Sequence, residues 1–546
     1  VFALLVIAWM ALRALGIGPA GSLLASGKLS ASDKVLVAAF DAPAADSSLG
    51  STIAEAVRTN LSQSRAVHVL PTSSVVAALE QMKRPDTARV DLATAREVAQ
   101  RAGAKAVVAG SVVPAGGGYI VTARLVAAET GDELASYHES AKDAGDLIPA
   151  VDRVTKSLRG KIGESLKSVR EAPRLDQVTT ASLGALRSYA EGLRANDIEA
   201  DYQGAVDDFR EAIRQDSTFA MAYVQLAFSL QTLGGRARAA QANDAFAAAF
   251  RLRDRLPERE RYDVEGAYYY TWNDRPKAIQ ALRRAIELDS TNTDAANTLA
   301  NALGDTRDSA GAVQMYHLAL AGDPGNGTML SNLAFQYSTR GRHAAFDSVM
   351  MLMASRSASF PTAGVRFNEL WNRRDYDGAE RLLRSEADTA RPRDALDAKD
   401  GLVTMAALHG RLREAEREYA QVNDAKARVR GDTVSPYIVA YFHSMLDGEL
   451  RGDVSRGLAV LDSALRTMPL ASVPVAQDQS MWLTLGYARL GAPAKAREVL
   501  SQHEARLDSQ GRRQNSVFAV RVLGAIALAE GKTDSAVTYF RRGDLE

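Results

Sequence analysis

From residue 183 to residue 546, apolar residues recur at helical spacing and divide the chain into short amphipathic segments. Ala205, Ala239, Ala278 and Ala312 each stand early in such a segment, and their successive spacings are 34, 39 and 34 residues. A period close to 34 is typical of stacked helix pairs, in which no single pair buries its apolar face without its neighbours. The pattern therefore predicts an α-solenoid of about nine pairs over 183–546, some of them degenerate.

The first helix of each predicted pair carries a pattern of its own. The segments VQLAFSL (224–230), NTLANAL (297–303), SNLAFQY (331–337) and RVLGAIA (521–527) place a leucine before a small residue. We expect the small residue to let the two helices of a pair approach closely. Large residues of the second helices would then fill the seam to the next pair: Phe209, Leu282, Tyr316 and Phe540.

Later pairs are harder to delimit. Ala379, Ala415 and Ala496 mark further second helices, whereas Phe346 stands where a small residue is expected. The segment near 425–475 fits the period poorly, which predicts an irregular pair there.

One stretch of this region resembles the tetratricopeptide repeat family. In TLANALGDTRDSAGAVQMYHLALAGDP, the residues Leu299, Ala300, Tyr316, Ala319 and Pro324 match the positions that characterise the family. The resemblance implies a superhelix whose concave groove holds a peptide or protein partner.

Residues 33–170 show the shorter period of strands between helical segments. KVLVAAF (34–40) and AVHVLP (66–71) predict two buried strands, and 104–140 predicts three more, with turns at Gly116–Gly118 and at ETGDE. Helices are predicted around Ile53–Leu61, at Val75–Met82, at Leu92–Ala102 and, as one long helix, at Leu147–Val169. The segment is therefore predicted to be a small α/β domain.

This α/β segment resembles the TolB amino-terminal-like domain in VLVAAFD, LGSTIAEAVRTNLSQSRAVHVLP and AGAKAVVAGSVVPAGGGYIVTARLVAAETGDEL. The junction 182–230 resembles the first repeat after such a domain in bacterial signalling proteins. That resemblance implies the C-terminal, non-catalytic part of a transmembrane serine/threonine kinase or a relative. The 546 residues contain no H-R-D or D-F-G motif and no strand-lysine motif of kinases.

The N-terminal residues are strongly apolar. Val1–Leu12 is an uninterrupted apolar run that resumes at Ala14–Ile17, so we expect a truncated transmembrane or signal-anchor helix at 1–18 and a linker at 19–32. A cleaved signal peptide and a buried helix are the alternatives. Gly16, Gly18 and Gly21 also match the dinucleotide pattern G-x-G-x-x-G, with Asp41 twenty residues later.

A flavin or NAD site at these glycines is the less favoured interpretation. The preceding residues suit a helix better than the short strand that such a loop requires, and Gly27 interrupts the helix that should follow it. The triple glycine Gly116–Gly118, flanked by strands, is interpreted as a hairpin tip. We therefore expect no cofactor.

Composition limits the remaining chemistry. Lys plus Arg and Asp plus Glu both number 66, so no overall positive charge favours nucleic acid. Cysteine is absent, and the seven histidines have no metal-ligand spacing, so neither thiol chemistry nor a zinc site is expected. No catalytic motif is found.

These patterns predict a multidomain chain of the α+β and all-α classes, with a membrane helix, an α/β domain and a solenoid. The expected function is a membrane-anchored interaction scaffold in the bacterial inner membrane, mostly periplasmic, with a cytoplasmic location as the alternative. The expected partners are the lipid bilayer and a peptide or protein. The candidate groove residues are Asn297, Asn301, Asn332, Tyr270 and Trp272. A receptor role, in which the α/β domain senses a small molecule, is a further possibility.

Overall fold

The α/β domain is built on a five-stranded sheet in the order β2-β1-β3-β4-β5. β1 (Lys34–Val37) runs parallel to β2 (His68–Val69) and to β3 (Ala104–Ala115), while β4 (Gly118–Ala127) and β5 (Glu133–Ala141) extend the sheet as antiparallel hairpins. The turn between β3 and β4 contains Gly116 and Gly117 at φ 58° and 87°. The expected hairpin tip is confirmed. The computed structural model describes residues 22–30, 33–64, 66–85, 89–199, 201–234, 236–256, 258–289, 292–356, 362–388, 392–430 and 434–545.

Helices cover both faces of this sheet, because successive strand residues point to opposite sides. Val35 and Val37 belong to the core under α2 (Ser48–Ser62) and α5 (Leu147–Ile162). Leu36 and Ala38 belong to a separate core with α3 (Thr72–Gln81) and α4 (Leu92–Arg101). The continuous apolar run of β1 is thus explained by burial on both faces.

The long helix predicted at Leu147–Val169 is wrong, because it breaks after Ile162. Gly163 adopts φ 132°, and a second short helix, α6 (Leu166–Glu171), follows. The break turns Glu164 back onto Arg159, and the two side chains form a buried ion pair at 2.8 Å, with 2% and 1% of their surface exposed. This ion pair forms where the helix would otherwise have continued.

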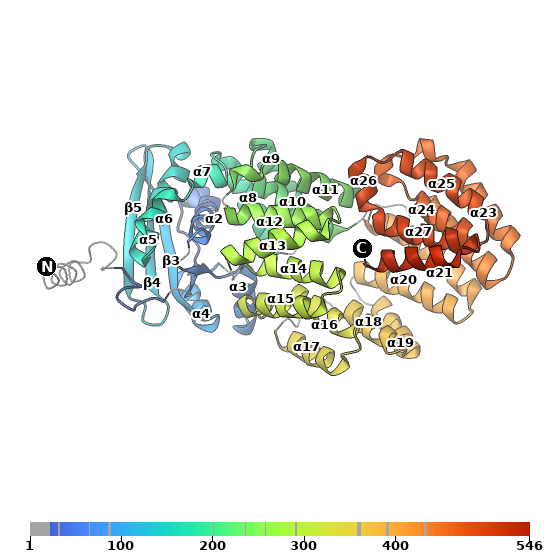
Figure 1. Ribbon diagram of the computed structural model, residues 1–546. Helices are drawn as coiled ribbons and strands as arrows, with labels where there is room; N and C mark the ends of the chain where they lie inside the picture. Colours follow the sequence, from blue (N-terminus) through green and yellow to red (C-terminus); the bar gives the residue numbers. More distant parts are fainter. Residues whose placement is uncertain are drawn as a thin grey trace, which may run out of the picture.

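Helix pairs form the rest of the chain (Figure 1). Within each pair the two helices run side by side, and the first helices of several successive pairs also contact one another, as α12 contacts α14 and α22 contacts α24. We call the side formed by the first helices the inner face. The pairs are α8 (Leu183–Asp197) with α9 (Tyr202–Gln215), α10 (Ala220–Leu233) with α11 (Arg236–Arg251), α12 (Glu258–Thr271) with α13 (Arg275–Leu288), α14 (Thr293–Asp305) with α15 (Ser309–Gly322), α16 (Gly327–Ser338) with α17 (His343–Arg356), α18 (Ala363–Asn372) with α19 (Tyr376–Ala387), α20 (Pro392–Leu408) with α21 (Leu412–Arg430), α22 (Pro436–Met445) with α23 (Val454–Thr467), α24 (Ser480–Arg489) with α25 (Pro493–Ala505), and α27 (Ser516–Ala529) with α28 (Thr533–Leu545).

Small residues bring the helices of a pair together, as the sequence predicted. Ala300 and Ala312 are fully buried in α14 and α15. A Cβ atom added at Gly192 would lie 2.7 Å from the ring of Phe209, and one added at Gly266 would lie 2.5 Å from Leu282. The large side chain therefore covers the small residue of its own pair, instead of filling only the seam to the next one.

The predicted packing position of Ala239 is wrong. Ala239 is exposed in the first turn of α11, whereas Ala242 and Ala249 of the same helix are fully buried. The chain leaves α10 through Gly234 at φ 66°, and within residues 238–242 of α11 the buried side chain is that of Ala242. Ala379, Ala415 and Ala496 are all fully buried in second helices, as predicted.

Aspartates cap the start of five second helices, α9, α13, α15, α19 and α23. The side chain of Asp308 accepts a hydrogen bond from the amide of Gly311 at 2.9 Å, and Asp375 does the same for Gly378 at 2.8 Å. Each such cap satisfies an amide that has no partner within the helix. The repeated turn is therefore encoded locally.

The irregular region predicted near 425–475 is confirmed. α22 continues into a π-helical turn, Leu446–Leu450, and two short 3-10 turns separate α23 from α24. A side chain at Gly448 would meet Leu490 at 2.3 Å, so the widened turn lies tightly against α24 and its loop. Insertions of this kind change the stacking of neighbouring pairs locally.

The α/β domain lies across the N-terminal pairs. Its α2 packs on α8, and one continuous core runs from the sheet to Phe246 of α11. At the far edge, Lys34 Nζ donates to the carbonyl of Gly322 at 3.1 Å, and the Ser74 hydroxyl donates to Asp323 at 3.3 Å. The sheet and the solenoid are thus joined at both ends of the contact (Figure 1).

The far end of the solenoid approaches the N-terminal pairs. The Asn273 amide donates to the hydroxyl of Ser516 at 3.3 Å, and Arg513 of α26 (Ser509–Gln514) lies 3.3 Å from Asp274. These contacts join the turn between α12 and α13 to the start of α27. The solenoid therefore curves enough to bring its C-terminal pairs against its second and third pairs.

The predicted membrane helix at 1–18, residues 19–21, 31 and 32 of the predicted linker and the glycines Gly16–Gly21 lie outside the described residues. Residues 22–30 of that linker are described, and they bury Leu23 and Leu29 in the core of the α/β domain. Among the helices that are described, none is long and apolar enough to cross a membrane.

Candidate functional site

Two of the predicted groove residues lie together on the inner face. Asn332 of α16 donates from its side-chain amide to Asn297 of α14 at 3.1 Å. Both side chains are half-buried. Their mutual hydrogen bond links two successive first helices and so stiffens the inner face. Each asparagine side chain has donor and acceptor groups beyond those used in this bond.

The other three predicted residues are engaged in packing. Asn301 accepts a hydrogen bond from the buried Tyr316 hydroxyl at 2.5 Å. The guanidinium of Arg275 lies 4.1 Å from the ring centre of Tyr270. Trp272 stacks obliquely on Tyr268, with ring centres 5.9 Å apart. The structure brings only the two asparagines Asn297 and Asn332 into direct contact among the five predicted residues.

The inner face of the first four pairs forms a cavity with the α/β domain. We call it the interdomain cavity; its volume is about 400 Å³. One wall comes from the inner-face helices α8, α10, α12 and α14. The opposite wall comes from the end of α2, from Val69 of β2 and from Pro71, which precedes α3. The groove predicted for a peptide is therefore covered by the α/β domain in this region.

Arg259 belongs to the polar wall of this cavity. Its guanidinium donates to the carbonyl of Ser62 at 2.6 Å and pairs with Asp289 at 3.0 Å and Glu260 at 2.9 Å. Since Ser62 belongs to α2 and Asp289 follows α13, Arg259 ties the α/β domain to the solenoid. Its charge is balanced by these partners.

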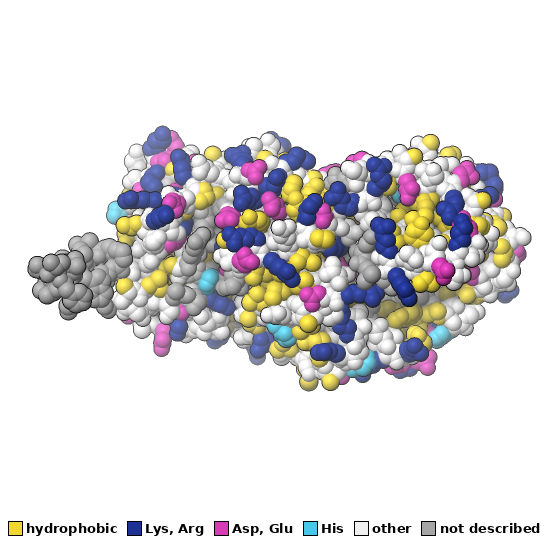
Figure 2. Space-filling view, viewed as in Figure 1, with side chains coloured by type: hydrophobic (Ala, Val, Ile, Leu, Met, Phe, Trp, Pro, Cys, Tyr) yellow, Lys and Arg dark blue, Asp and Glu magenta, His cyan; other side chains and the backbone are white. Residues whose placement is uncertain are grey.

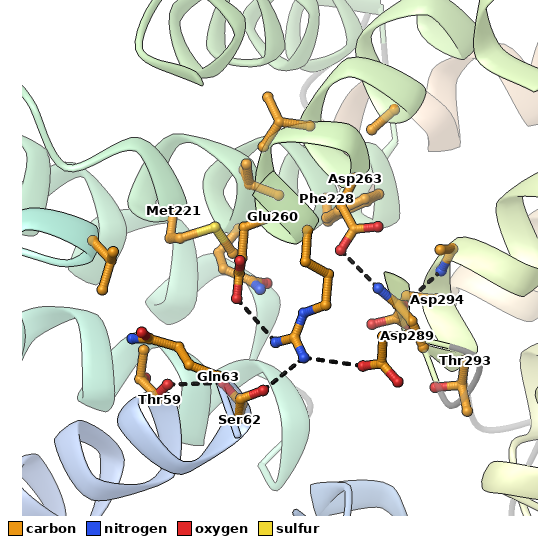
Figure 3. A pocket seen from close by; sticks show the side chains of 18 of the residues that line it. Thr59, Ser62, Gln63, Met221, Phe228, Glu260, Asp263, Asp289, Thr293 and Asp294 are labelled. Atoms are coloured by element: carbon orange, nitrogen blue, oxygen red, sulfur yellow. Dashed lines mark hydrogen bonds and ion pairs between the residues drawn. The ribbon is translucent and has the colours of Figure 1, made fainter. Parts of the chain in front are cut away.

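Two further carboxylates face the cavity. Asp263 accepts a hydrogen bond from Asn292 at 2.7 Å through one oxygen, while its other oxygen is buried without a hydrogen-bond partner. Burial raises the pKa of Asp263 to about 7, with Glu260 and Asp294 adding to the rise and Arg259 opposing it. Asp294 is exposed and its side chain lines the cavity (Figure 3).

The pKa of the Asp294 carboxyl group is also raised. Although the residue keeps exposed surface, the protein atoms around the cavity displace part of the water that would stabilise the ionised form, and Asp197 and Asp323 repel its charge. Gln63, the residue that follows α2, contributes a side-chain amide whose nitrogen and oxygen are both buried without partners. The apolar part of the lining includes Phe219, Met221 and Val264. The cavity therefore combines an apolar floor with an acidic wall.

Sequence reasoning missed this acidic wall, although the repeat period contains a signal for it. Asp263 stands 34 residues before Asn297, so the two occupy equivalent positions of successive first helices. Extending the period upstream from the predicted asparagines would have identified Asp263. The contribution of Gln63 carries no such signal, because it depends on how the α/β domain docks.

Aromatic side chains form a row across the first helices of the C-terminal pairs. Tyr441 of α22, Trp482 of α24 and Phe518 of α27 follow one another with ring centres 5.1 Å apart at each step. All three are half-buried. We call them the aromatic row; hydrophobic side chains gather over α24 and α27 in Figure 2, among scattered charges of both signs.

One cluster contains the residue types of a catalytic triad without its geometry. The Ser480 hydroxyl lies 3.2 Å from His503 Nδ1, and Asp478 lies 3.1 Å from the same nitrogen. A relay requires the serine and the aspartate on opposite ring nitrogens, and here His503 Nε2 is buried without a partner. The cluster instead joins the start of α24 to α25.

Within the described residues, no three His, Asp or Glu side chains are placed to hold a metal ion. Asp41, the candidate partner of a dinucleotide ribose, forms an exposed ion pair with Arg89 at 2.6 Å. The described segment between β1 and α2 contains no glycine, so a dinucleotide loop is not found at the position where this strand would feed it.

Comparison with known proteins gives only distant similarities. No family model matches the chain, and no curated protein matches it. The human IFIT1 dimer with m7Gppp-AAAA is 16% identical, with a TM-score of 0.36 over 74% of this chain and 90% of that chain. The APC/C hetero-tetramer Cut9-Hcn1 is 14% identical, with a TM-score of 0.36 over 73% of this chain and 74% of that chain. MamA is 18% identical, with a TM-score of 0.22 over 31% of this chain and 97% of that chain. The resemblance to the TolB amino-terminal-like domain and to kinase C-terminal regions therefore rests on the residues quoted above.

Proposed function

We propose that this chain is an interaction scaffold that holds a peptide or protein segment on the inner face of its pairs from α16 to α27. The observation that carries the proposal is the aromatic row of Tyr441, Trp482 and Phe518, which crosses three first helices and keeps part of each ring accessible. Half-exposed aromatic side chains supply large contact area at little conformational cost.

Repeat equivalence extends this surface toward α16. Phe335 follows the buried Ala334 as Phe228 follows the buried Ala227, and Phe228 lines the interdomain cavity on the inner face. Phe335 therefore belongs to the inner face as well, and it is 44% exposed. Beyond the part covered by the α/β domain, the inner face thus offers apolar anchors for a partner.

The partner segment is expected to carry apolar side chains spaced to reach successive first helices. The hydroxyl of Tyr441 accepts a hydrogen bond from Arg489 at 3.1 Å, and Arg489 also pairs with Glu449 at 2.6 Å. This fixes one end of the aromatic row in place. A pre-ordered surface loses less side-chain freedom when it binds.

Photo-crosslinking in the native host tests this role. A photoreactive phenylalanine at Phe335, Trp482 or Phe518 is expected to give the same discrete adduct. At Met351, which is 68% exposed on the second helix α17, the adduct is expected to be absent. Adducts of the same kind and yield at all four positions, or none at the three inner-face positions, would contradict the proposal.

We further propose that residues 1–18 anchor the scaffold in the bacterial inner membrane, with the bulk of the chain in the periplasm. The apolar run Val1–Leu12 and the resemblance to kinase C-terminal regions support this placement. Washed membranes are expected to retain the chain at alkaline pH and to lose it when 1–18 are deleted. Protease added to spheroplasts is expected to degrade it; protection there would indicate the cytoplasmic side.

A further inference from the structure

We propose that the interdomain cavity binds a compact organic cation, one ammonium or guanidinium group carried on an apolar body. The site is distinct from the inner-face surface proposed for a partner, because the α/β domain covers the N-terminal pairs and the aromatic row lies on α22, α24 and α27. The two proposals therefore succeed or fail separately.

The volume and shape of the cavity set the size of the ligand. About 400 Å³ lies within the range of pockets that take small molecules. Phe219, Met221, Val224 and Val264 supply apolar surface from α10, α12 and the residue before α10. An entirely polar ion would leave this surface in contact with water, whereas an apolar body would cover it.

The charge of the lining sets the sign of the ligand. Among the described residues that line the cavity, there are four carboxylates, Glu260, Asp263, Asp289 and Asp294, and one cation, Arg259. Glu260 and Asp289 are occupied by Arg259, so the negative charge that is not neutralised lies on Asp263 and Asp294. A cationic group placed between them would gain Coulomb attraction from both in a partly desolvated site.

Unused hydrogen-bonding groups indicate where that cation would sit. One carboxylate oxygen of Asp263 is buried without a hydrogen-bond partner. On the opposite wall, the side-chain amide nitrogen and oxygen of Gln63 are also buried without partners. Buried polar atoms normally have partners, and leaving them unpaired costs free energy. Ammonium and guanidinium groups donate several hydrogen bonds, which matches the carboxylate and the Gln63 carbonyl oxygen.

Binding is expected to depend on pH. The groups that face Asp263 are Arg259 and Glu260 on its own helix, Asp289 after α13, Asn292 and Asp294 at the start of α14 and Gln63 after α2. With a pKa of about 7, Asp263 is mostly protonated at pH 6 and mostly ionised at pH 8. A ligand that needs the carboxylate therefore binds about tenfold more weakly at pH 6 than at pH 8.

The test uses the 546-residue chain with named probes in calorimetric titration and thermal shift. Phenethylamine and benzamidine represent free cations, acetylated and amidated Ala-Lys-Ala and Ala-Arg-Ala represent a basic side chain of a peptide, and benzyl alcohol is the neutral control. Binding by the free amines identifies a small-molecule ligand, and binding by the peptides alone identifies a side chain of a partner. Either result supports the proposal, provided that benzyl alcohol does not bind.

Two variants locate the binding. Asp294→Asn, at an exposed position in the first turn of α14, is expected to weaken binding roughly tenfold or more. Asp263→Asn is expected to remove the pH dependence as well. Asp377→Asn, an exposed carboxylate of α19 outside the cavity, should change neither property. No binding by any cation, equal binding of the alcohol, or equal effects of Asp294→Asn and Asp377→Asn would overturn the proposal.

Discussion

Replacing Glu164 by Gln tests whether the break after Ile162 is held by a buried ion pair. Glu164 accepts two hydrogen bonds from Arg159, at 2.8 and 2.9 Å, and further ones from Ser64 at 2.8 Å and Ser168 at 2.6 Å. Arg159 also donates to Asn60 of α2. The change would therefore leave a buried guanidinium without its counter-charge, at the junction of three helices.

The size of the effect follows from the burial of both side chains, of which 1% and 2% remain exposed. Removing one partner of a buried ion pair costs about 3 kcal/mol or more, because the remaining charge is left in a poorly solvated site. Exchange of the most protected amides of β3 and β4 would then accelerate about 150-fold at 25 °C. Hydrogen exchange with mass spectrometry measures this within the α/β domain.

The matched control is Glu171→Gln in α6. Glu171 lies 3.9 Å from Lys167, and their side chains are 67% and 82% exposed, so this change is expected to leave exchange almost unaltered. The double variant Arg159→Leu with Glu164→Leu is expected to recover part of the loss, because it removes both buried charges. Equal exchange rates in Glu164→Gln and Glu171→Gln would refute the reasoning.

Two further changes test the packing of the pairs and the acid response. Gly266→Val places a side chain 2.5 Å from Leu282, so we expect calorimetry to show that the free energy of unfolding falls by about 1–3 kcal/mol. The control Gly364→Val, whose Cβ meets nothing within 4 Å, is expected to lower it much less. Equal losses of stability in the two variants would contradict the close approach of α12 and α13. Burial opposes ionisation of Asp478, but hydrogen bonds led by that from His503 lower its pKa to about 2 from 3.8. A carboxyl group whose pKa is lowered by folding stabilises the protein above pH 3.8, and this stability is lost as the pH falls toward 2. In urea titrations, the free energy of unfolding of Asp478→Asn should therefore be about 2 kcal/mol lower than that of the parent at pH 7 and equal to it near pH 2. A pH-independent difference would contradict this assignment.

The solenoid could be predicted because its signals are local. Small residues such as Ala300 and Ala312 and caps such as Asp308 each act within one pair, so the period of the sequence carries the fold. Ala239 shows the limit of that reasoning, since the same residue type at the right spacing is exposed when the turn before it changes. The break at Gly163 was missed because the apolar spacing continues across it.

The site could be predicted only in part. Asn297 and Asn332 lie next to each other, as the repeat predicts, because their positions depend only on the stacking of successive helix pairs. The interdomain cavity depends on docking of the α/β domain. The contacts that fix this docking use common side chains: the Lys34 ammonium donates to a backbone carbonyl 288 residues away, and the Arg259 guanidinium donates to a backbone carbonyl 197 residues away. No local pattern marks such contacts.

The most direct test of the whole account is a disulfide between the α/β domain and the solenoid. A Cβ atom built on Gly325 lies 3.5 Å from the Cβ atom of Ala77, within the range that a disulfide spans, and the chain has no cysteine of its own. Mild oxidation of the Ala77→Cys, Gly325→Cys variant is expected to give one intramolecular crosslink in nearly all molecules. The Ala77→Cys, Gly364→Cys pair should give none, because nothing lies within 4 Å of a Cβ at Gly364. Failure of the first pair to crosslink, or equal crosslinking of both pairs, would contradict the docking of the α/β domain on the inner face.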